Sequence, residues 1–169
     1  EPIKQRLLPA VCKGECILAI CMTEPHAGTD VANYTTNTEV RGATLRLKGV
    51  KTLCSRAEEA GAFVVFTRIN GAPGRDGIGC VLVNRNTPGF EVTARYHTMG
   101  GEYLAEIQFN NCEVPVENVI LEGGERTERT DGNGTAYLSG FGAAPTARLQ
   151  VNVLEVVRQW RFAVPQHRG

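Results

Sequence analysis

The stretch 21–30 concentrates side chains that could bind a polar ligand. It reads Cys-Met-Thr-Glu-Pro-His-Ala-Gly-Thr-Asp and follows an apolar run, 17–22, which predicts a strand. The hydroxyls of Thr23 and Thr29 can both donate and accept hydrogen bonds. Gly28 can take a positive φ and, lacking a Cβ, lets backbone N–H groups approach a bound group closely. These groups at a strand end suit a polar ring edge or a phosphate, although an ordinary surface loop would fit the same pattern.

Five blocks in the same order along the chain resemble the acyl-CoA dehydrogenase family. In that family's flavin loop, Thr-Glu-Pro is followed by Gly and then by Ser or Thr before Asp, as in 23–30 here. The blocks are Lys4-Gln5-Arg6 with Leu8-Pro9 and Gly14-Glu15, the loop 22–30, Gly49-Val50-Lys51 with Ser55, Thr87-Pro88-Gly89-Phe90 with Met99-Gly100, and Phe109-Asn110-Asn111-Cys112 running on through Val114-Pro115 to Glu117-Asn118-Val119. They cover residues 3–121, so membership of the family is the firmest prediction from the sequence.

The resemblance implies a binding site for FAD. It makes Thr23 a contact of the flavin ring, Met22 a backbone contact, and Thr29 a contact near the phosphates and the acyl-CoA chain. Ser55 would donate to flavin N5. Leu53 stands where the family usually has an aromatic residue beside the ring, which predicts weak FAD binding or none. The implied cofactor-binding set is Ile20, Met22, Thr23, Gly28, Thr29, Leu53 and Ser55, with Thr29 also as the substrate contact. The alternative for Thr23 is a hydroxyl that only caps its own backbone.

The family's reaction is the α,β-desaturation of acyl-CoA thioesters, in which a carboxylate removes the α-proton and the β-hydride passes to the flavin. The resemblance places that carboxylate beyond residue 169 or on a helix that this chain lacks. Glu24, Glu102 and Glu106 do not match it, and Arg148 is out of register with the family's substrate-holding Arg. No catalytic residue is therefore assigned. We expect a fragment or truncated member that is inactive alone. The alternative is a non-catalytic binding or assembly module derived from the family.

The composition excludes some partners. Lys plus Arg and Asp plus Glu each number 18 in the 169 residues, which gives no reason to expect nucleic acid or an anionic membrane. No apolar run approaches the ~20 residues of a membrane helix and no signal peptide is visible, so we expect a cytoplasmic location. The six cysteines match zinc spacing poorly and are expected to be small buried hydrophobes, with no metal site. No role is assigned to His26, His97 or His167.

Short β-rich runs separated by turn residues predict a mainly β fold, an antiparallel barrel or sandwich of six to seven strands over 17–121. The resemblance implies a barrel, because the family's middle domain is a small β-barrel between two helical domains.

A short helical lead-in over 1–16, interrupted by Pro9, precedes the β unit, and a polar linker over 122–145 follows it. The segment 146–169 is predicted to form a helix over 146–162 and a tail. The apolar stripe of that helix needs a partner, so we expect a homo-oligomer or missing helical domains. The stripe consists of Leu149, Val153, Val156, Val157 and Trp160.

Overall fold

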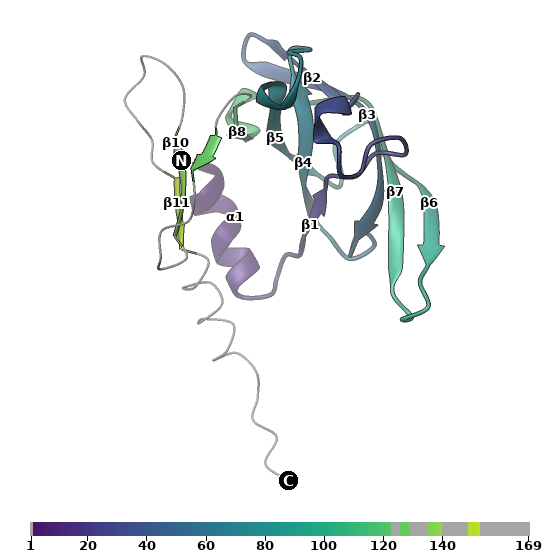
Figure 1. The fold of residues 1–169 in the computed structure, drawn as a ribbon. Helices are drawn as coiled ribbons and strands as arrows, with labels where there is room; N and C mark the ends of the chain where they lie inside the picture. The colour runs from purple at the N-terminus through teal and green to yellow at the C-terminus, as the bar shows by residue number, and fades with distance from the viewer. Residues whose placement is uncertain (1, 123–125, 129–134, 140–148, 153–169) are drawn as a thin grey trace. The chain divides into compact units, whose positions relative to one another are not determined.

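The computed structural model describes residues 2–122, 126–128, 135–139 and 149–152. The chain divides into two compact units, 1–124 and 125–169, and each is described by itself. The first unit begins with one helix, α1 (Pro2–Cys12), and continues into a sheet of eight strands (Figure 1). The strands are β1 (Leu18–Cys21), β2 (Asn37–Arg41), β3 (Thr44–Ser55), β4 (Ala62–Ile69), β5 (Ile78–Asn84), β6 (Phe90–His97), β7 (Tyr103–Pro115) and β8 (Val119–Leu121). Three single 3-10 turns are η1 (Val31–Asn33), η2 (Arg75–Gly77) and η3 (Val116–Asn118).

The order of strands in the sheet is β6-β7-β3-β2-β4-β5-β8, and β1 pairs with β4 outside this path. Most neighbours are antiparallel, but β1 and β2 both pair with β4 in parallel. The sheet is therefore mixed. A period of two in the sequence reveals which side chains share a face but carries no information on strand direction, so the sequence could not distinguish these parallel pairs.

The predicted closed barrel is wrong. Among the described strands, β6 pairs only with β7 and β8 pairs only with β5, so no ladder joins the two ends of the sheet. The sheet nevertheless curls strongly. The ring of Phe90 on β6 lies 4.6 Å from the ring of Phe63 on β4, although three strands separate β6 from β4 in the sheet. The prediction of a mainly β unit is confirmed, and the architecture is an open, curled sheet.

The core fills the inside of the curl. Alternate residues of the strands point inward, and Phe90 also meets Phe109 of β7 edge to face at 5.8 Å. β5 is buried on both faces. η3 lies against it, and Asn118 of η3 donates from Nδ2 to the carbonyl of Leu82 at 2.9 Å. The largest apolar side chains buried in the core are Leu45, Leu47, Phe63, Val65, Val81, Val83, Ile107 and Phe109.

Several boundaries follow from local chemistry. The runs 62–69 and 78–84, predicted as strands between turn residues, coincide with β4 and β5. The predicted hairpin turn at 41–43 joins β2 to β3, with Gly42 at φ 62°. Pro9 lies inside α1 instead of interrupting it. Within the described part of the chain, no helix has the length and apolar character needed to cross a membrane.

The second unit contains a three-stranded antiparallel sheet of β9 (Arg126–Glu128), β10 (Thr135–Ser139) and β11 (Leu149–Asn152), in the order β11-β10-β9. Two of these strands lie in the segment that the sequence placed in a linker. The predicted helix over 146–162 is wrong at 149–152, because these residues pair with β10 as a strand. The rest of that predicted helix, with Val153, Val156, Val157 and Trp160, lies outside the described residues.

Candidate functional site

The loop predicted to bind a ligand leaves the sheet at a gap along one edge of β4. β1 occupies this edge from Ala62 to Val65, and β2 occupies it at Arg68 and Ile69. The chain between β1 and β2, residues 22–36, must therefore leave the sheet after the pairing with Val65 and rejoin it three residues further along β4, at Arg68. It returns through a backbone hydrogen bond from the N–H of Arg68 to the carbonyl of Thr36, at 2.8 Å. Strand pairing thus fixes both ends of the loop.

The structure brings this loop together with the second predicted segment, at the end of β3. The backbone N–H of Thr52 donates to the carbonyl of Thr23 at 2.8 Å, and Lys51 Nζ donates to the carbonyl of Met22, also at 2.8 Å. These two hydrogen bonds hold the start of the loop, residues 22–23, beside residues 51–52 of β3. Within the loop, Glu24 and Ala27 exchange two backbone hydrogen bonds, of 2.9 and 3.1 Å, which close a tight turn.

A buried ion pair lies directly beneath the place where the two segments meet. Lys51 Nζ is 2.9 Å from Oε1 of Glu24, and both side chains are fully buried. The Glu24 carboxylate also accepts hydrogen bonds from the backbone N–H groups of Thr35 and Thr36, at 2.7 and 3.0 Å, and from the Thr35 hydroxyl at 3.0 Å. Lys51 Nζ lies 3.8 Å from the centre of the Tyr34 ring. The pair is thus supported by further hydrogen bonds and a cation–π contact, as a buried charge requires.

The surroundings shift the titration of both charged groups. Burial by itself would raise the pKa of Glu24, but the hydrogen bonds from Thr35, Lys51 and Thr36 and the charge of Lys51 outweigh it and lower this pKa to about 2. Burial lowers the pKa of Lys51, and the contact with Glu24 opposes that effect. A carboxylate held in this way accepts hydrogen bonds from fixed donors and is not free to remove a proton from a substrate.

Above the ion pair, the predicted site residues form a surface of mixed character. Ile20 on β1, Met22 after it and Leu53 on β3 are 59%, 41% and 51% exposed, which is unusual for large apolar side chains beside a core. Thr23 is half-buried, and Ser55, at the end of β3, is exposed. Among the described residues, neither of these two hydroxyls has a side-chain hydrogen-bond partner. The surface therefore offers apolar contact area beside unused hydroxyls.

Gly28 and Thr29 lie in the exposed part of the same loop, after the turn that Glu24 and Ala27 close. A Cβ placed on Gly28 would meet nothing within 4 Å, and its φ lies outside the left-handed region. Gly28 therefore leaves open space beside the backbone, which lets a ligand approach it closely. Gly28 does not adopt the positive φ that a glycine allows. The carbonyl of Thr29 accepts a hydrogen bond from the N–H of Val31 at 3.2 Å, at the start of η1.

Leu53 owes its exposure to a β-bulge. The pairing of β3 with β7 shifts between Lys51 and Cys54, and Leu53 adopts a φ of 55°. In a regular strand Lys51 and Leu53 would share one face, whereas here Lys51 is buried and Leu53 is exposed. A left-handed backbone at Leu costs on the order of 1–2 kcal/mol, so the fold stores strain where Leu53 is presented.

The other carboxylates and the histidines do not assemble into a second site. Glu102 is exposed in the turn between β6 and β7, where its backbone N–H bonds to Thr98. Glu106 accepts hydrogen bonds from Thr93 and Tyr96, at 2.9 and 3.2 Å. His26 is half-exposed, and its Nε2 lies 3.3 Å from the carbonyl of Asn33. No group of metal-ligating side chains occurs in the described part of the chain.

The predicted burial of cysteines holds for four of the six: Cys21, Cys54, Cys80 and Cys112 are buried, Cys16 is half-buried, and Cys12 is exposed. Cys21 and Cys54 lie on the two segments that meet at the site. A hydrogen bond with the Cys54 side chain, together with burial, raises the pKa of the Cys21 thiol well above its ordinary value.

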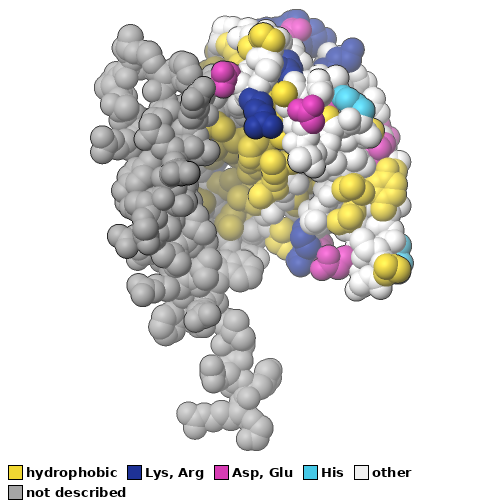
Figure 2. All heavy atoms as spheres, in the orientation of Figure 1, with side chains coloured by type: hydrophobic (Ala, Val, Ile, Leu, Met, Phe, Trp, Pro, Cys, Tyr) yellow, Lys and Arg dark blue, Asp and Glu magenta, His cyan; other side chains and the backbone are white. Residues whose placement is uncertain are grey.

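A second group of exposed apolar side chains lies over the β6–β7 hairpin (Figure 2). It consists of Tyr96, Met99 and Tyr103, which are 38%, 108% and 57% exposed. The Tyr103 ring packs on His97 with the ring centres 4.8 Å apart. This group contains none of the predicted site residues.

Reasoning from the sequence missed the residues that hold the site together. Glu24 and Lys51 were placed within the two flavin segments but not paired, and Tyr34 was not singled out. The available signal was a lysine, Lys51, inside a β-rich run between Val50 and Leu53. A charged residue in such a place requires a buried partner of opposite sign.

Comparison with known proteins shows which proteins this chain is similar to. Residues 19–112 match the model of the acyl-CoA dehydrogenase middle domain. Over 127 residues, the chain is 30% identical to an acyl-CoA dehydrogenase of Bacillus subtilis, covering 74% of this chain and 34% of that protein. It is 34% identical to the mitochondrial isobutyryl-CoA dehydrogenase of Bos taurus over 127 residues, covering 74% of this chain and 30% of that protein.

Solved structures agree with these relatives. An acyl-CoA dehydrogenase from Geobacillus kaustophilus superposes with a TM-score of 0.69 at 34% identity, covering 73% of this chain and 34% of that one. A glutaryl-CoA dehydrogenase from Mycobacterium smegmatis, solved in complex with FADH2, has a TM-score of 0.63 at 25% identity, covering 70% of this chain and 30% of that one. The chain thus spans about a third of the length of the relatives it matches.

Proposed function

Because the chain belongs to the acyl-CoA dehydrogenase family, we propose that it carries the flavin-facing surface of an enzyme that desaturates acyl-CoA thioesters. The matched region is the family's middle domain, and a glutaryl-CoA dehydrogenase of similar structure has been solved with FADH2. In this proposal the chain supplies one wall of the cofactor site, and the activity belongs to a larger assembly.

The observation that carries the proposal is the surface above the Glu24–Lys51 pair. FAD has a flat ring with a polar edge, and it needs apolar area beside hydrogen-bonding groups. The exposed side chains of Ile20, Met22 and Leu53 supply the apolar area. The open space at Gly28 admits a bulky group close to the backbone. The residues present therefore fit the cofactor.

Each residue of this surface has a proposed role. Thr23 and Ser55 direct hydroxyls at the ring edge, and the backbone of Met22 adds a further contact. Gly28 and Thr29 lie toward the phosphates, with Thr29 also near the acyl-CoA chain. Leu53 covers the ring with aliphatic surface in place of an aromatic side chain, which gives less stacking energy and supports weaker binding.

FAD, when bound, supplies the acceptor for the hydride that leaves the β-carbon of the substrate. The residues of this chain bind and orient the ring and exclude water from one side of it. The carboxylate that removes the α-proton is not proposed among Glu24, Glu102 and Glu106. Glu24 in particular is fully buried and paired with Lys51. We propose that the chain binds FAD but does not desaturate acyl-CoA on its own.

The test is a titration of the apo chain with FAD, followed by flavin fluorescence. We expect saturable binding in roughly the micromolar range, since contacts from other parts of a larger assembly are missing. Thr23→Val removes one hydroxyl with little change in shape, and losing one hydrogen bond of about 1 kcal/mol should weaken binding about fivefold. Thr44→Val is the matched control, because Thr44 is exposed at the β2–β3 turn. Equal affinities for wild type and Thr23→Val would contradict the proposed site.

A further inference from the structure

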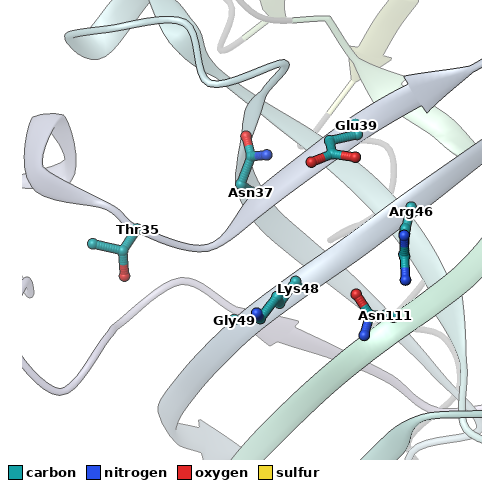
Figure 3. Close-up of a pocket in the computed structure, with 7 residues that line it drawn as sticks. All are labelled: Thr35, Asn37, Glu39, Arg46, Lys48, Gly49 and Asn111. Carbon is teal, nitrogen blue, oxygen red and sulfur yellow. The ribbon is translucent and has the colours of Figure 1, made fainter.

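A polar cavity of about 350 Å³ lies on β2, β3 and β7. Glu39, Arg46, Lys48 and Asn111 surround the same space from these three strands (Figure 3). Apart from Thr35, none of the lining residues belongs to the loop between β1 and β2 or to the segment 51–55, and no apolar side chain lines the cavity. The full lining set is Thr35, Asn37, Glu39, Arg46, Lys48, Gly49 and Asn111.

The cavity forms where β3 and β7 fall out of regular pairing. The register shifts between Leu47 and Gly49, so that Lys48 has no partner on β7, although it pairs with Asn37 of β2 on its other side. On the opposite strand Asn111 takes a left-handed backbone with φ 53°. Gly49 must remain a glycine, since a Cβ there would lie 2.5 Å from Oγ1 of Thr36. The bulge turns polar side chains toward one hollow instead of spacing them along a flat strand.

The charges of the lining favour an anion. Two cations, Arg46 and Lys48, face one carboxylate, Glu39, which Arg41 already engages at 2.6 Å. Within the described residues, Lys48 has no ion pair. Nε of Arg46 is buried and has no hydrogen-bond partner in the structure as described. A buried donor of this kind calls for an acceptor, and the guanidinium and ammonium groups are the two that best recognise phosphate.

We propose that this cavity binds a small molecule that carries a phosphate or diphosphate group. Arg46 and Lys48 hold the phosphate oxygens, and the amide nitrogen of Asn37 is free to donate because its Oδ1 accepts from the N–H of Gly71 at 2.8 Å. The volume exceeds what inorganic phosphate alone requires, which favours a phosphate attached to a larger body such as a nucleoside. The site is independent of the proposed function, since it shares none of the residues proposed to contact FAD.

The experiment is calorimetric titration of the full chain with ADP and, separately, with inorganic phosphate, at fixed ionic strength. We expect saturable binding of ADP and weaker binding of inorganic phosphate. Lys48→Gln should weaken ADP binding at least about fivefold, whereas Glu39→Gln, which removes the opposing carboxylate, should strengthen it about threefold. Opposite effects of two exposed substitutions cannot arise from a general loss of structure. Lys13→Gln, which removes one exposed positive charge elsewhere, should leave the affinity unchanged.

Other outcomes separate this site from the flavin surface. Thr23→Val should not alter ADP binding, so a loss of affinity in that variant would mean that ADP occupies the flavin surface and would overturn the proposal. The absence of saturable binding of either probe would also overturn it, as would equal losses in Lys48→Gln and Lys13→Gln. Failure of FAD binding together with intact, Lys48-dependent ADP binding would refute the proposed function alone.

Discussion

Glu24 and Lys51 are 27 residues apart, yet Nζ of one lies 2.9 Å from Oε1 of the other, with both side chains fully buried. Each belongs to one of the two segments that form the proposed flavin surface. The ion pair therefore joins these segments from below, while the hydrogen bond between Thr52 and Thr23 joins them at the backbone. The position of the exposed side chains above therefore depends on an interaction that is buried beneath them.

Replacing Lys51 by methionine should destabilise the fold strongly. The substitution leaves the carboxylate of Glu24 buried without its cation, and breaking a buried pair in this way costs about 3–5 kcal/mol. Urea unfolding followed by circular dichroism measures the change. As the matched control, Arg41→Met disrupts the exposed pair with Glu39 and should cost at most about 1 kcal/mol.

The double variant Glu24→Gln with Lys51→Met tests whether the cost arises from the unpaired charge. Because neither charge remains, it should recover a large part of the stability that Lys51→Met loses. A double variant as unstable as the sum of the two single variants would show that the two side chains act separately.

Acid should weaken the fold through Glu24. Its pKa in the folded chain is about 2, below the ordinary value of 4.5, so the unfolded chain binds more protons between these values. The stabilisation from this group is therefore complete above about pH 4.5 and is lost as the pH falls toward 2. Urea unfolding at pH 6, 4 and 3 should show this loss in wild type and a shallower loss in Glu24→Gln. Parallel curves for the two proteins would contradict the assignment.

Leu53→Gly should raise the free energy of unfolding by about 0.5–1 kcal/mol. Glycine adopts the left-handed backbone without strain, and the gain is reduced by its larger entropy in the unfolded chain. Asn111→Gly, at φ 53°, is the comparison, and its gain should be smaller because Asn tolerates this conformation better than Leu. Thermal unfolding measures both changes. A destabilised Leu53→Gly variant would mean that the side chain contributes packing that outweighs the strain.

Gly49→Ala should destabilise the chain more than Gly42→Ala. Both glycines have positive φ, at 152° and 62°, but a Cβ at Gly49 would lie 2.5 Å from Oγ1 and 2.6 Å from Cα of Thr36. A Cβ at Gly42 would meet nothing within 4 Å. The clash should add about 1–3 kcal/mol to the conformational cost, which is itself greater for Ala at φ 152° than at φ 62°. Similar losses in urea unfolding would mean that Thr36 moves aside at little cost.

The sequence predicted the strands that turn residues isolate, but not how those strands are arranged. β4 and β5 were found because polar turns flank 62–69 and 78–84. The alternation of side chains carries no information on which strands are neighbours. It therefore revealed neither the parallel pairing of β1 and β2 with β4 nor the lack of pairing between β6 and β8, and the closed barrel was predicted wrongly. At 149–152, helical spacing of apolar residues gave way to pairing with β10, a tertiary effect that overrides a local pattern.

The sequence motif located the candidate site, but it did not reveal the buried ion pair between Glu24 and Lys51 that supports the site. The loop 22–30 and the segment 51–55 were identified because their residue patterns are specific to a family, and backbone and Lys51 hydrogen bonds hold the two segments side by side. The pairing of Glu24 with Lys51 depends on which strands are neighbours, which the residues alone do not reveal. The left-handed backbone of Leu53 was equally hidden, because Leu has no local preference for it.

The two irregularities of β3 and β7 cancel each other. Leu47 pairs with Cys112 and Gly49 with Phe109, so β7 holds one extra residue there, whereas between Lys51 and Cys54 the extra residue is on β3. The pairing register of β3 with β7 is therefore the same at both ends of the ladder, as it would be if neither extra residue were present. Deleting one extra residue alone would exchange the inward and outward sides of every position beyond it. The number of residues in the part of β3 that carries Leu53 and the number in the paired part of β7 can consequently change only together.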